Sequence, residues 1–388
     1  MIDKLIILIH NIINSHYKTR RGLSLERFLY YLSKIYKIAV LSRNFLFKFK
    51  IFQSRSLPCF VISIGNIVAG GTGKTPMTIF LANYLISLGY KVAIVTRGYK
   101  GTFEHKGGIV CDGDKTLCTP QEAGDEPFMM AKLLKLPLIV GKNRFKAGMT
   151  AIKEFSPDII ILDDAFQHIA LKRDLNLLLL DTNNPFGNNY LLPRGTLREP
   201  LSSIRRSNAV IYTHSSSNTL PNIHIDNIIP GHIPVFTSDH MSYINKVVPE
   251  NYFALSASKT RKDISSYIQG KQILLFSGIA NNSNLKKSCE QMGFIINQHI
   301  KFTDHYQYTK KDIDQIKTLF NQANMDFIVT TLKDYTKTSD FFSAEYPVIV
   351  LDVNIQFNGQ NRQNFELFLK NRLKQQTLSS NGGIIWKK

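Results

Sequence analysis

The hexapeptide Gly70-Gly71-Thr72-Gly73-Lys74-Thr75 is the most informative stretch of this 388-residue chain. A short β-branched run at residues 59–64 precedes it, and a helix-like segment at residues 76–88 follows it. Glycines let backbone N–H groups curl around phosphate oxygens, and the start of a helix adds favourable partial charge. We therefore expect Lys74 to reach the β- and γ-phosphates of a nucleotide, and the Thr75 hydroxyl to hold Mg²⁺.

One position departs from the usual phosphate-binding pattern. That pattern has a glycine five residues before Gly73, and this chain has Val68 there. A glycine-rich turn without a ligand is the alternative interpretation. The strand before the loop, the helix after it and the adjacent Lys-Thr pair favour phosphate binding.

Strands and helices alternate around this loop. The apolar runs at residues 159–162 and 177–180 have no polar interruption, which is typical of strands covered on both faces of a parallel sheet. We predict an α/β fold: a P-loop NTPase-type doubly wound sheet, a second, smaller α/β lobe and an N-terminal helical segment. The other predicted segments are strands at 92–96, 138–140, 272–276, 294–300, 327–331 and 348–353, helices at 127–136 and after Thr309 (with Asp312 in its capping box), a hairpin at 103–115 and a loop at 215–227.

The charge is distributed unevenly along the chain. There are 48 Lys and Arg against 29 Asp and Glu, a net charge of +19, which favours anionic partners. Residues 1–56 hold eleven of the basic residues against Asp3 and Glu26, interleaved with aromatic residues. This pattern suits a helix lying on an anionic membrane, or equally a helix packed on its own domain. We predict three domains: a membrane-associating segment at 1–56, a nucleotide-binding core at 57–230 and a second lobe at 231–388.

Several classes of protein are disfavoured. The four cysteines, at positions 59, 111, 118 and 289, form no CxxC pair and no zinc-type cluster. The longest uncharged N-terminal stretch, residues 5–17, is short and partly polar, so we expect neither an ordinary transmembrane helix nor a signal peptide. No helix-turn-helix, zinc finger or RNA-binding motif accompanies the charge, so nucleic acid is not an expected partner.

Two successive acids, Asp163 and Asp164, follow the apolar run at residues 159–162. A strand that ends in an acid is what a Mg²⁺ site beside a phosphate loop needs. The two carboxylates would point in different directions, one toward the water shell of the metal and the other toward Gln167 or His168. Simple capping of a strand end is the alternative.

Asp125 and His305 are candidates for proton transfer. In Gly124-Asp125-Glu126-Pro127, Asp125 could be the general base for an attacking hydroxyl or a metal ligand, or it could only cap a helix. His305 follows Asp304, whose carboxylate could fix the imidazole tautomer, and imidazole has the right pKa range to assist proton transfer.

Arginines supply candidate phosphate contacts. Residues 192–200, Leu-Pro-Arg-Gly-Thr-Leu-Arg-Glu-Pro, carry Arg194 and Arg198 among proline and glycine, and Arg144 is a further candidate. A surface ion pair is the default alternative for each.

Taken in order, these segments resemble one family, the tetraacyldisaccharide 4'-kinases. A phosphate loop alone fits many families, whereas the ordered set across residues 57–335 is specific. The matching motifs are Gly65-Asn66 with the phosphate loop and Pro76, Thr96-Arg97-Gly98-Tyr99, Gly124-Asp125-Glu126-Pro127, Asp163-Asp164-Ala165-Phe166-Gln167-His168, the loop at 192–200, Asp304-His305-Tyr306 and Thr330-Thr331-Leu332-Lys333-Asp334.

The resemblance implies transfer of the γ-phosphate of ATP to the 4'-hydroxyl of a tetraacylated, 1-phosphorylated glucosamine disaccharide, a lipid A precursor. It also implies a location at the cytoplasmic face of the bacterial inner membrane, with an N-terminal membrane-binding helix. The roles it implies are Asp125 as base assisted by His305; Gly70, Gly71, Thr72, Gly73, Lys74 and Thr75 on phosphate and Mg²⁺; Glu126, Asp163 and Asp164 at the metal; Arg144 and Arg198 on phosphate charge; and Gln167 at the nucleotide.

The chain departs from the family at two motif positions. Leu332 stands where the family usually has Glu, and Arg194 where it usually has Ala, so neither is given a polar role in the site. One rival interpretation is a membrane-associated P-loop ATPase switch without a small acceptor. Such a switch usually has a second lysine early in the loop, where this chain has Val68 and Ala69. A soluble kinase for a small cofactor is another.

Overall fold

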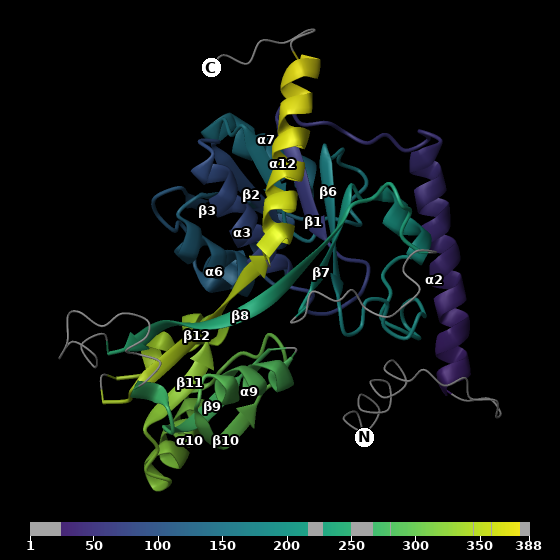
Figure 1. The fold of residues 1–388 in the computed structure, drawn as a ribbon. Helices are drawn as coiled ribbons and strands as arrows, with labels where there is room; N and C mark the ends of the chain where they lie inside the picture. Colours follow the sequence, from purple (N-terminus) through teal and green to yellow (C-terminus); the bar gives the residue numbers. More distant parts are fainter. Residues whose placement is uncertain are drawn as a thin grey trace. The chain divides into compact units, whose positions relative to one another are not determined.

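The computed structural model describes residues 25–215, 228–249, 267–279, 281–343, 345–357 and 359–380. Residues 1–24 of the predicted membrane segment and 216–227 of the predicted loop lie outside the described residues. The chain forms two compact units, each gathered from separate stretches (Figure 1). The first takes the described residues up to Arg97, those from Leu136 to His240 and those from Ile355; the second takes those from Gly98 to Lys135 and from Met241 to Asn354.

A parallel sheet lies at the centre of the first unit. Its strand order is β8-β7-β6-β1-β5-β2-β4, and the paired strands run parallel, with Val61 opposite Ile160 between β1 and β5. Every residue of β2, β5 and β7 is buried, as expected for strands covered on both faces. The predicted α/β fold is therefore confirmed. The strands are β1 Phe60–Gly65, β2 Val92–Thr96, β4 Pro137–Val140, β5 Ile159–Leu162, β6 Leu175–Asp181, β7 Ala209–Thr213 and the first part of β8 Val235–Val248.

Helices cover this sheet with apolar stripes. In α3, Met77, Leu81 and Leu85 recur every fourth residue and are fully buried. In α12, which lies across the sheet in Figure 1, the Phe365 ring packs 5.2 Å from that of Phe236 in β8. The helices are α3 Lys74–Ser87, α7 Arg144–Phe155, α12 Gly359–Ser380 and a 3-10 turn, η1 Leu201–Arg206.

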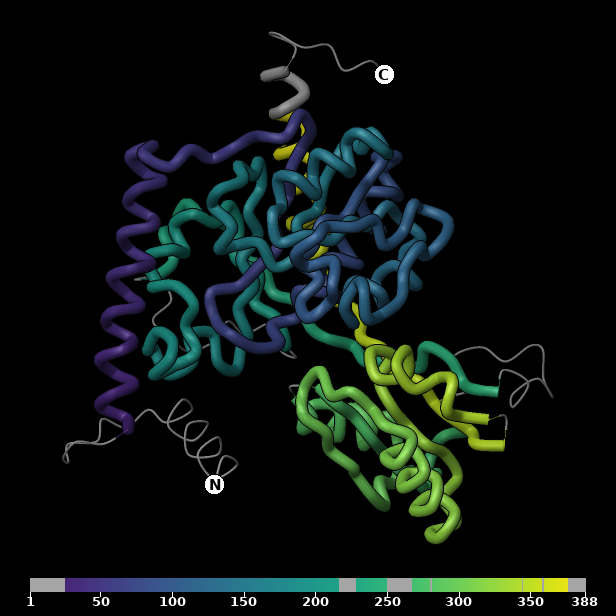
Figure 2. Tube along the Cα trace, turned by 180° about the vertical axis from the view of Figure 1, so that it is seen from behind, coloured from purple at the N-terminus to yellow at the C-terminus, as the bar shows by residue number. Residues whose placement is uncertain are grey.

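The long helix α2, Leu25–Lys48, stands at one side of the first unit in both views (Figure 1; Figure 2). The Tyr36 hydroxyl donates to the Arg198 carbonyl at 2.9 Å. Two ion pairs of 2.6 Å, Arg43 with Glu199 and Arg194 with Glu26, join the helix to the loop at residues 192–200. Arg194, which was given no role in the site, is thus a structural anchor. Among the described residues, no helix combines the length and apolarity needed to cross a bilayer.

The second unit has its own parallel sheet, ordered β10-β9-β11-β12. Alternate residues of β9 face opposite sides, so that Leu274 packs with Ile313 of α10 while Leu275 packs with Leu285 of α9. Thr309 and Asp312 form the predicted capping box of α10. The elements are β9 Gln272–Ser277, α9 Asn282–Gln291, β10 Ile295–Lys301, α10 Lys310–Gln322, β11 Phe327–Thr331, α11 Leu332–Thr338, η4 Ser339–Phe341 and β12 Val348–Phe357.

Residues 98–135, which belong to the second unit, differ from the sequence-based prediction of a hairpin. The expected hairpin at residues 103–115 is only partly right, because residues 103–106 form a helical turn and the hairpin is confined to Val110–Leu117, where the Leu117 N–H donates to the Val110 carbonyl. A positive-φ glycine, Gly107, separates the two pieces. The elements are α4 Phe103–Lys106, β3 Gly108–Asp112, α5 Pro120–Ala123 and α6 Asp125–Leu134.

The compact units divide the chain differently from the predicted continuous lobes at 57–230 and 231–388. Strand β8 leaves the first unit after His240, and β12 returns to it at Ile355. The boundary therefore runs through two long strands, which have no glycine, proline or linker-like stretch to mark it.

Candidate active site

The phosphate loop lies between β1 and α3, at the carboxyl edge of the first sheet. In a parallel sheet the carboxyl ends of neighbouring strands meet at one edge, so residues that follow β1, β5, β6 and β7 gather there. Gly70 and Gly73 both have positive φ, 134° and 77°, and Gly73 is the N-cap of α3. Left-handed glycines of this kind allow successive backbone N–H groups to converge on an anion.

Three side chains from elsewhere in the first unit hold the loop in shape. Asn66 Nδ2 donates to Thr72 Oγ1 at 2.8 Å. Gln167 Nε2 donates to the Asn66 carbonyl at 2.6 Å, and Thr213 Oγ1 at the end of β7 donates to the Thr72 carbonyl at 3.2 Å. Gln167, predicted to lie at the nucleotide, thus contacts the residue that precedes the loop and holds Thr72.

Lys74 folds back over the loop that precedes it. Its Nζ lies 3.4 Å from the Gly70 carbonyl and 3.9 Å from Asp164 Oδ1. Arg198 Nη1 contacts both Asp164 oxygens, at 3.2 and 3.1 Å. Burial alone would raise the pKa of Asp164, but Lys74 and Arg198 outweigh it and hold that pKa below the ordinary value. Two cations and one ionised carboxylate therefore meet above the phosphate loop.

The two successive acids have different partners, as predicted, but Asp164 contacts Lys74 and Arg198 and not Gln167 or His168. Asp163 is 2% exposed and accepts from Thr78 Oγ1 at 2.9 Å and from Thr96 Oγ1 at 3.4 Å. Asp164 has φ of 47° and turns to Lys74 and Arg198 instead. The buried acid is oriented by hydroxyls, while its neighbour takes the cations.

Arg144 begins α7, directly after β4. It is 4% exposed, and its Nη1 donates to the Gly141 carbonyl at 3.0 Å and to the Lys142 carbonyl at 3.3 Å. Its charge is among those that lower the pKa of Asp164. Arg144 therefore contributes to the positive field around the loop.

The donor set suits a hard cation. Thr75 offers a hydroxyl and Asp163 and Asp164 offer carboxylates, the oxygen ligands that Mg²⁺ prefers. Within the described residues, no three His, Cys, Asp or Glu side chains are grouped so that they could hold a metal unaided. A metal bound jointly with a nucleotide fits this arrangement.

The second unit brings together the other predicted pair, Asp125 and His305. Asp125 Oδ2 lies 3.1 Å from His305 Nδ1 and 2.6 Å from Lys337 Nζ. Asp125 is the first residue of α6, and the N-cap is Gly124, with φ of 86°. The interpretation of Asp125 as a simple cap is therefore wrong. A Cβ at Gly124 would meet the Tyr99 carbonyl at 2.8 Å.

Electrostatics keep Asp125 ionised. Burial favours the neutral acid, but hydrogen bonds from His305 and Lys337 prevail and lower its pKa. Lys333 extends the cluster: its Nζ lies 2.8 Å from Asp304 Oδ1, 3.5 Å from His305 Nε2 and 3.8 Å from Glu126 Oε1. Glu126 thus faces a lysine of the second unit.

The motif at residues 330–334 contains both buried side chains and one side chain that contacts a predicted site residue. Leu332 is 7% exposed and packs with Ile328 and Ile313, so the residue in the usual position of Glu is a core side chain. Asp334 is fully buried and accepts from the Gly278 N–H at 3.0 Å. Lys333 is the one that contacts His305.

The model of the family described as tetraacyldisaccharide-1-P 4'-kinase, LpxK, matches residues 25–374. The chain belongs to this family. A tetraacyldisaccharide 4'-kinase of Desulfatibacillum aliphaticivorans is 36% identical over 344 residues, which is 88% of this chain and 91% of that protein. One of Syntrophus aciditrophicus is 36% identical over 334 residues, 84% and 88% of the two chains.

A solved structure of the same family is also similar. It is the LpxK of Aquifex aeolicus, an "apo" form described as in complex with ATP, with a TM-score of 0.69 and 29% identity. The match covers 89% of this chain and 99% of that one. The family predicted from the ordered motifs is therefore confirmed, and membership of a kinase family does not favour the ATPase switch.

In each unit, sequence reasoning missed residues that contact the predicted site residues. Lys337 follows Lys333 by four residues, so both lie on one face of α11, a spacing that could have revealed the pair. His240 of β8 packs against Gly73 and contacts His214, which lies 3.3 Å from Asp181. These three residues are far apart in sequence, and only the order of β6, β7 and β8 brings them together.

Proposed function

We propose that this chain transfers the γ-phosphate of ATP to the 4'-hydroxyl of a tetraacyl glucosamine disaccharide 1-phosphate, a lipid A precursor. The observation that carries the proposal is the phosphate loop with Lys74, Asp164 and Arg198 above it, in a chain of the tetraacyldisaccharide-1-P 4'-kinase family. The Aquifex relative described with ATP supports ATP as the donor.

The first unit would hold the nucleotide. Backbone N–H groups from Gly70 to Lys74 would bind the β-phosphate, and Lys74 Nζ would move from the Gly70 carbonyl onto the γ-phosphate. Arg198 would steady the charge that develops on the transferred group, and Arg144 would add to the field. Asp164 keeps both cations in place until the nucleotide binds.

The residues fit a Mg²⁺ ion, which would neutralise charge on the β- and γ-phosphates. Thr75 and the adjacent carboxylates Asp163 and Asp164 would hold it, directly or through water. Glu126, also predicted at the metal, contacts Lys333 at 3.8 Å, so we propose that it acts on the metal only after this pair opens.

Asp125 would act on the acceptor hydroxyl. Among the described residues, both partners of this carboxylate contact Oδ2, which leaves Oδ1 to accept the hydroxyl proton. The lowered pKa makes Asp125 a weak base, but phosphoryl transfer passes through a loose transition state that needs orientation more than strong deprotonation. The proton reaches the carboxylate as the oxygen bonds to phosphorus, and His305 and Lys337 hold the carboxylate in position.

Helix α2 would hold the enzyme at the cytoplasmic face of the bacterial inner membrane, on an anionic surface. Its exposed side includes Phe28, Tyr31, Ile35 and Ile38, each at least 60% exposed, together with Lys34 and Lys37. A tetraacylated acceptor stays in the bilayer, because each buried CH₂ is worth about 0.8 kcal/mol. An enzyme that phosphorylates this acceptor must therefore work at the membrane surface.

Two variants test this division of labour. Lys74→Ala should weaken both ATP binding and transfer. Asp125→Asn should leave ATP binding within about twofold of the wild type while lowering transfer by roughly 10²–10⁴. Calorimetry with an ATP analogue and transfer of labelled γ-phosphate to the acceptor measure the two. Equal loss of ATP binding in both variants would contradict the assignment of Asp125 to the acceptor, and ATP turnover without acceptor would favour the ATPase switch.

A further inference from the structure

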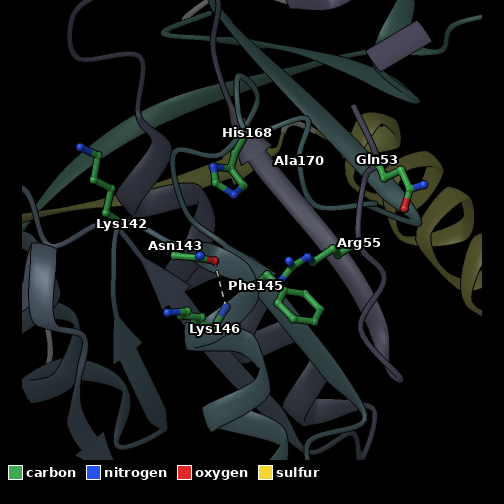
Figure 3. Close-up of a pocket in the computed structure, with 8 residues that line it drawn as sticks. All are labelled: Gln53, Arg55, Lys142, Asn143, Phe145, Lys146, His168 and Ala170. Carbon is green, nitrogen blue, oxygen red and sulfur yellow. Dashed lines mark hydrogen bonds between the residues drawn. The ribbon is translucent and has the colours of Figure 1, made fainter. Parts of the chain in front are cut away.

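A cavity of about 430 Å³ lies in the first unit, outside the phosphate loop (Figure 3). Figure 3 shows its walls coming from three places: the chain after α2, the start of α7 and the loop after β5. The lining residues are Gln53, Arg55, Lys142, Asn143, Phe145, Lys146, His168 and Ala170. The volume falls in the range of small-molecule sites and exceeds that of a single phosphate ion.

The walls of this pocket are cationic and carry no carboxylate. Arg55, Lys142 and Lys146 come from separate segments, yet none of them pairs with an acid among the described residues. Arg55 instead lies over the Phe145 ring at 5.0 Å, which fixes the plane of its guanidinium. All three side chains are exposed, and their uncompensated positive charge favours an anion in the pocket.

His168, which also lines the pocket, is held neutral by burial and by arginines outside the lining. Burial, followed by the charges of Arg144, Arg173 and Arg43, lowers its pKa to about 4, so the imidazole is neutral at physiological pH. The start of α7 is already capped, since Asn143 Oδ1 accepts from the Lys146 N–H at 3.1 Å. The side chains, and not the helix terminus, therefore define the attraction for an anion.

The pocket shares both of its loops with the nucleotide site. His168 lines it, while the preceding residue, Gln167, holds the phosphate loop through the Asn66 carbonyl. Lys142 lines it, and two residues later Arg144 contributes to the field at Asp164. A ligand here would lie on the framework that holds the donor phosphate.

The pocket also continues the apolar surface of α2. Exposed Phe49, Ile51 and Phe52 follow that helix, and Gln53 and Arg55 come directly after them. A lipid whose acyl chains lie along this surface would have its head group at the pocket. The anion expected here is therefore a phosphate on a membrane-resident lipid.

We propose that this cationic pocket binds the phosphate monoester that the glycolipid acceptor already carries, and so selects 1-phosphorylated acceptors. The inference rests on the proposed function and adds a specificity site to it. Lys142 and Lys146 would contact the phosphate oxygens, Arg55 would flank them, and the cavity would admit the adjoining sugar ring.

A comparison of two acceptors with two enzymes tests the proposal. The acceptors are the tetraacyl disaccharide with and without its 1-phosphate, in detergent micelles. The enzymes are the wild type and Lys142→Ala/Lys146→Ala. We expect the double variant to lose roughly 10- to 100-fold in kcat/KM with the phosphorylated acceptor, and less than about twofold with the other. The double variant should therefore lose the preference of the wild type for the phosphorylated acceptor.

Matched controls separate charge from structure. Lys153→Ala removes an exposed lysine from the other end of α7, where it lies 3.6 Å from Glu154, and should leave both acceptors unaffected. Lys142→Arg/Lys146→Arg should retain most of the preference. An equal loss with both acceptors would overturn the proposal and indicate a general role in binding phospholipid or in folding.

A binding measurement tests the pocket without depending on phosphoryl transfer. Glucosamine 1-phosphate, titrated into the wild type, should shift the NMR resonances of the His168 ring. It should also raise the pKa of this ring, because a bound anion offsets the positive charges around it. Glucosamine should do neither, and the double lysine variant should respond to neither sugar. If His168 is unmoved, the pocket proposal fails even where phosphoryl transfer is observed. If His168 responds and no transfer occurs, the proposed function fails instead.

Discussion

Gly73 is the residue at which the phosphate loop turns into helix α3, and two features forbid a side chain there. Its φ is 77°, and an added Cβ would collide with the His240 ring. We expect Gly73→Ala to destabilise the first unit by about 1–2 kcal/mol from the left-handed backbone alone, and by more if the ring cannot move. Urea unfolding measures this loss.

The adjacent loop supplies the control for that prediction. At Gly71 an added Cβ meets no atom within 4 Å. Gly71→Ala should therefore unfold at the same urea concentration as the wild type. Equal destabilisation by both variants would mean that His240 does not press on the loop.

His168 makes folding stability depend on pH. Its folded-state pKa, about 4, lies below the ordinary value of 6.5, so the unfolded chain takes up the proton first as the pH falls. The contribution of the neutral ring is complete above pH 6.5 and declines as the pH falls toward about 4. We expect His168→Gln to reduce the fall in the urea midpoint between neutral pH and about pH 5. An unchanged slope would show that the ring is solvated.

At the scale of elements, α2 has two unlike sides. Leu29, Ser33 and Val40 are buried on one side, and Ile35 and Ile38 are 64% and 65% exposed on the other. The interleaving of basic and aromatic residues in the sequence indicated a helix here. It could not indicate which apolar residues face the protein, because both sides carry them.

The exposed side of α2 should bind membranes. We expect Ile35→Ser/Ile38→Ser to lower binding to anionic vesicles by roughly tenfold or more, since each side chain loses part of the 1.5–3 kcal/mol available from full burial. Vesicle sedimentation measures the change. Ile86→Ser, at a 40% exposed isoleucine of α3, is the matched control and should leave binding intact. If the wild type and both variants bind vesicles equally, the exposed side of α2 does not bind the membrane.

At the scale of the whole molecule, the last helix completes the first unit. Phe365 of α12 is fully buried, with its ring 4.6 Å from Phe357 and 5.2 Å from Phe236. We expect Phe365→Ala to destabilise the first unit by about 3–5 kcal/mol and to lower its thermal midpoint. Leu367→Ala, at a 58% exposed position of the same helix, should stay within about 0.5 kcal/mol of the wild type. Similar behaviour of the two variants would mean that α12 is not part of the core.

The sequence predicts the elements of this molecule better than their assembly. Apolar runs such as residues 159–162 identify buried strands, because local composition alone decides them. The return of β12 and α12 to the first unit is invisible to such patterns, since it depends on pairings between distant segments.

The same division holds for the site. Motif spacing predicts Lys74, Asp164 and Arg198, which the structure brings together. It predicts Asp125 with His305 but misses Lys337, which is distant in sequence from Asp125 and contacts it at 2.6 Å. The four-residue spacing of Lys333 and Lys337 places both on one face of α11, but it does not indicate which acid Lys337 contacts.

The proposal that ATP bound at this loop phosphorylates a lipid can be tested by examining the lipid product. Purified protein is incubated with Mg-ATP and the 1-phosphorylated tetraacyl disaccharide, and the lipid is examined by mass spectrometry and by NMR. We expect one added phosphate, on the 4'-oxygen, and much less of this product when Lys74→Ala replaces the wild type. A lipid recovered unchanged while the folded wild-type protein hydrolyses ATP would contradict it.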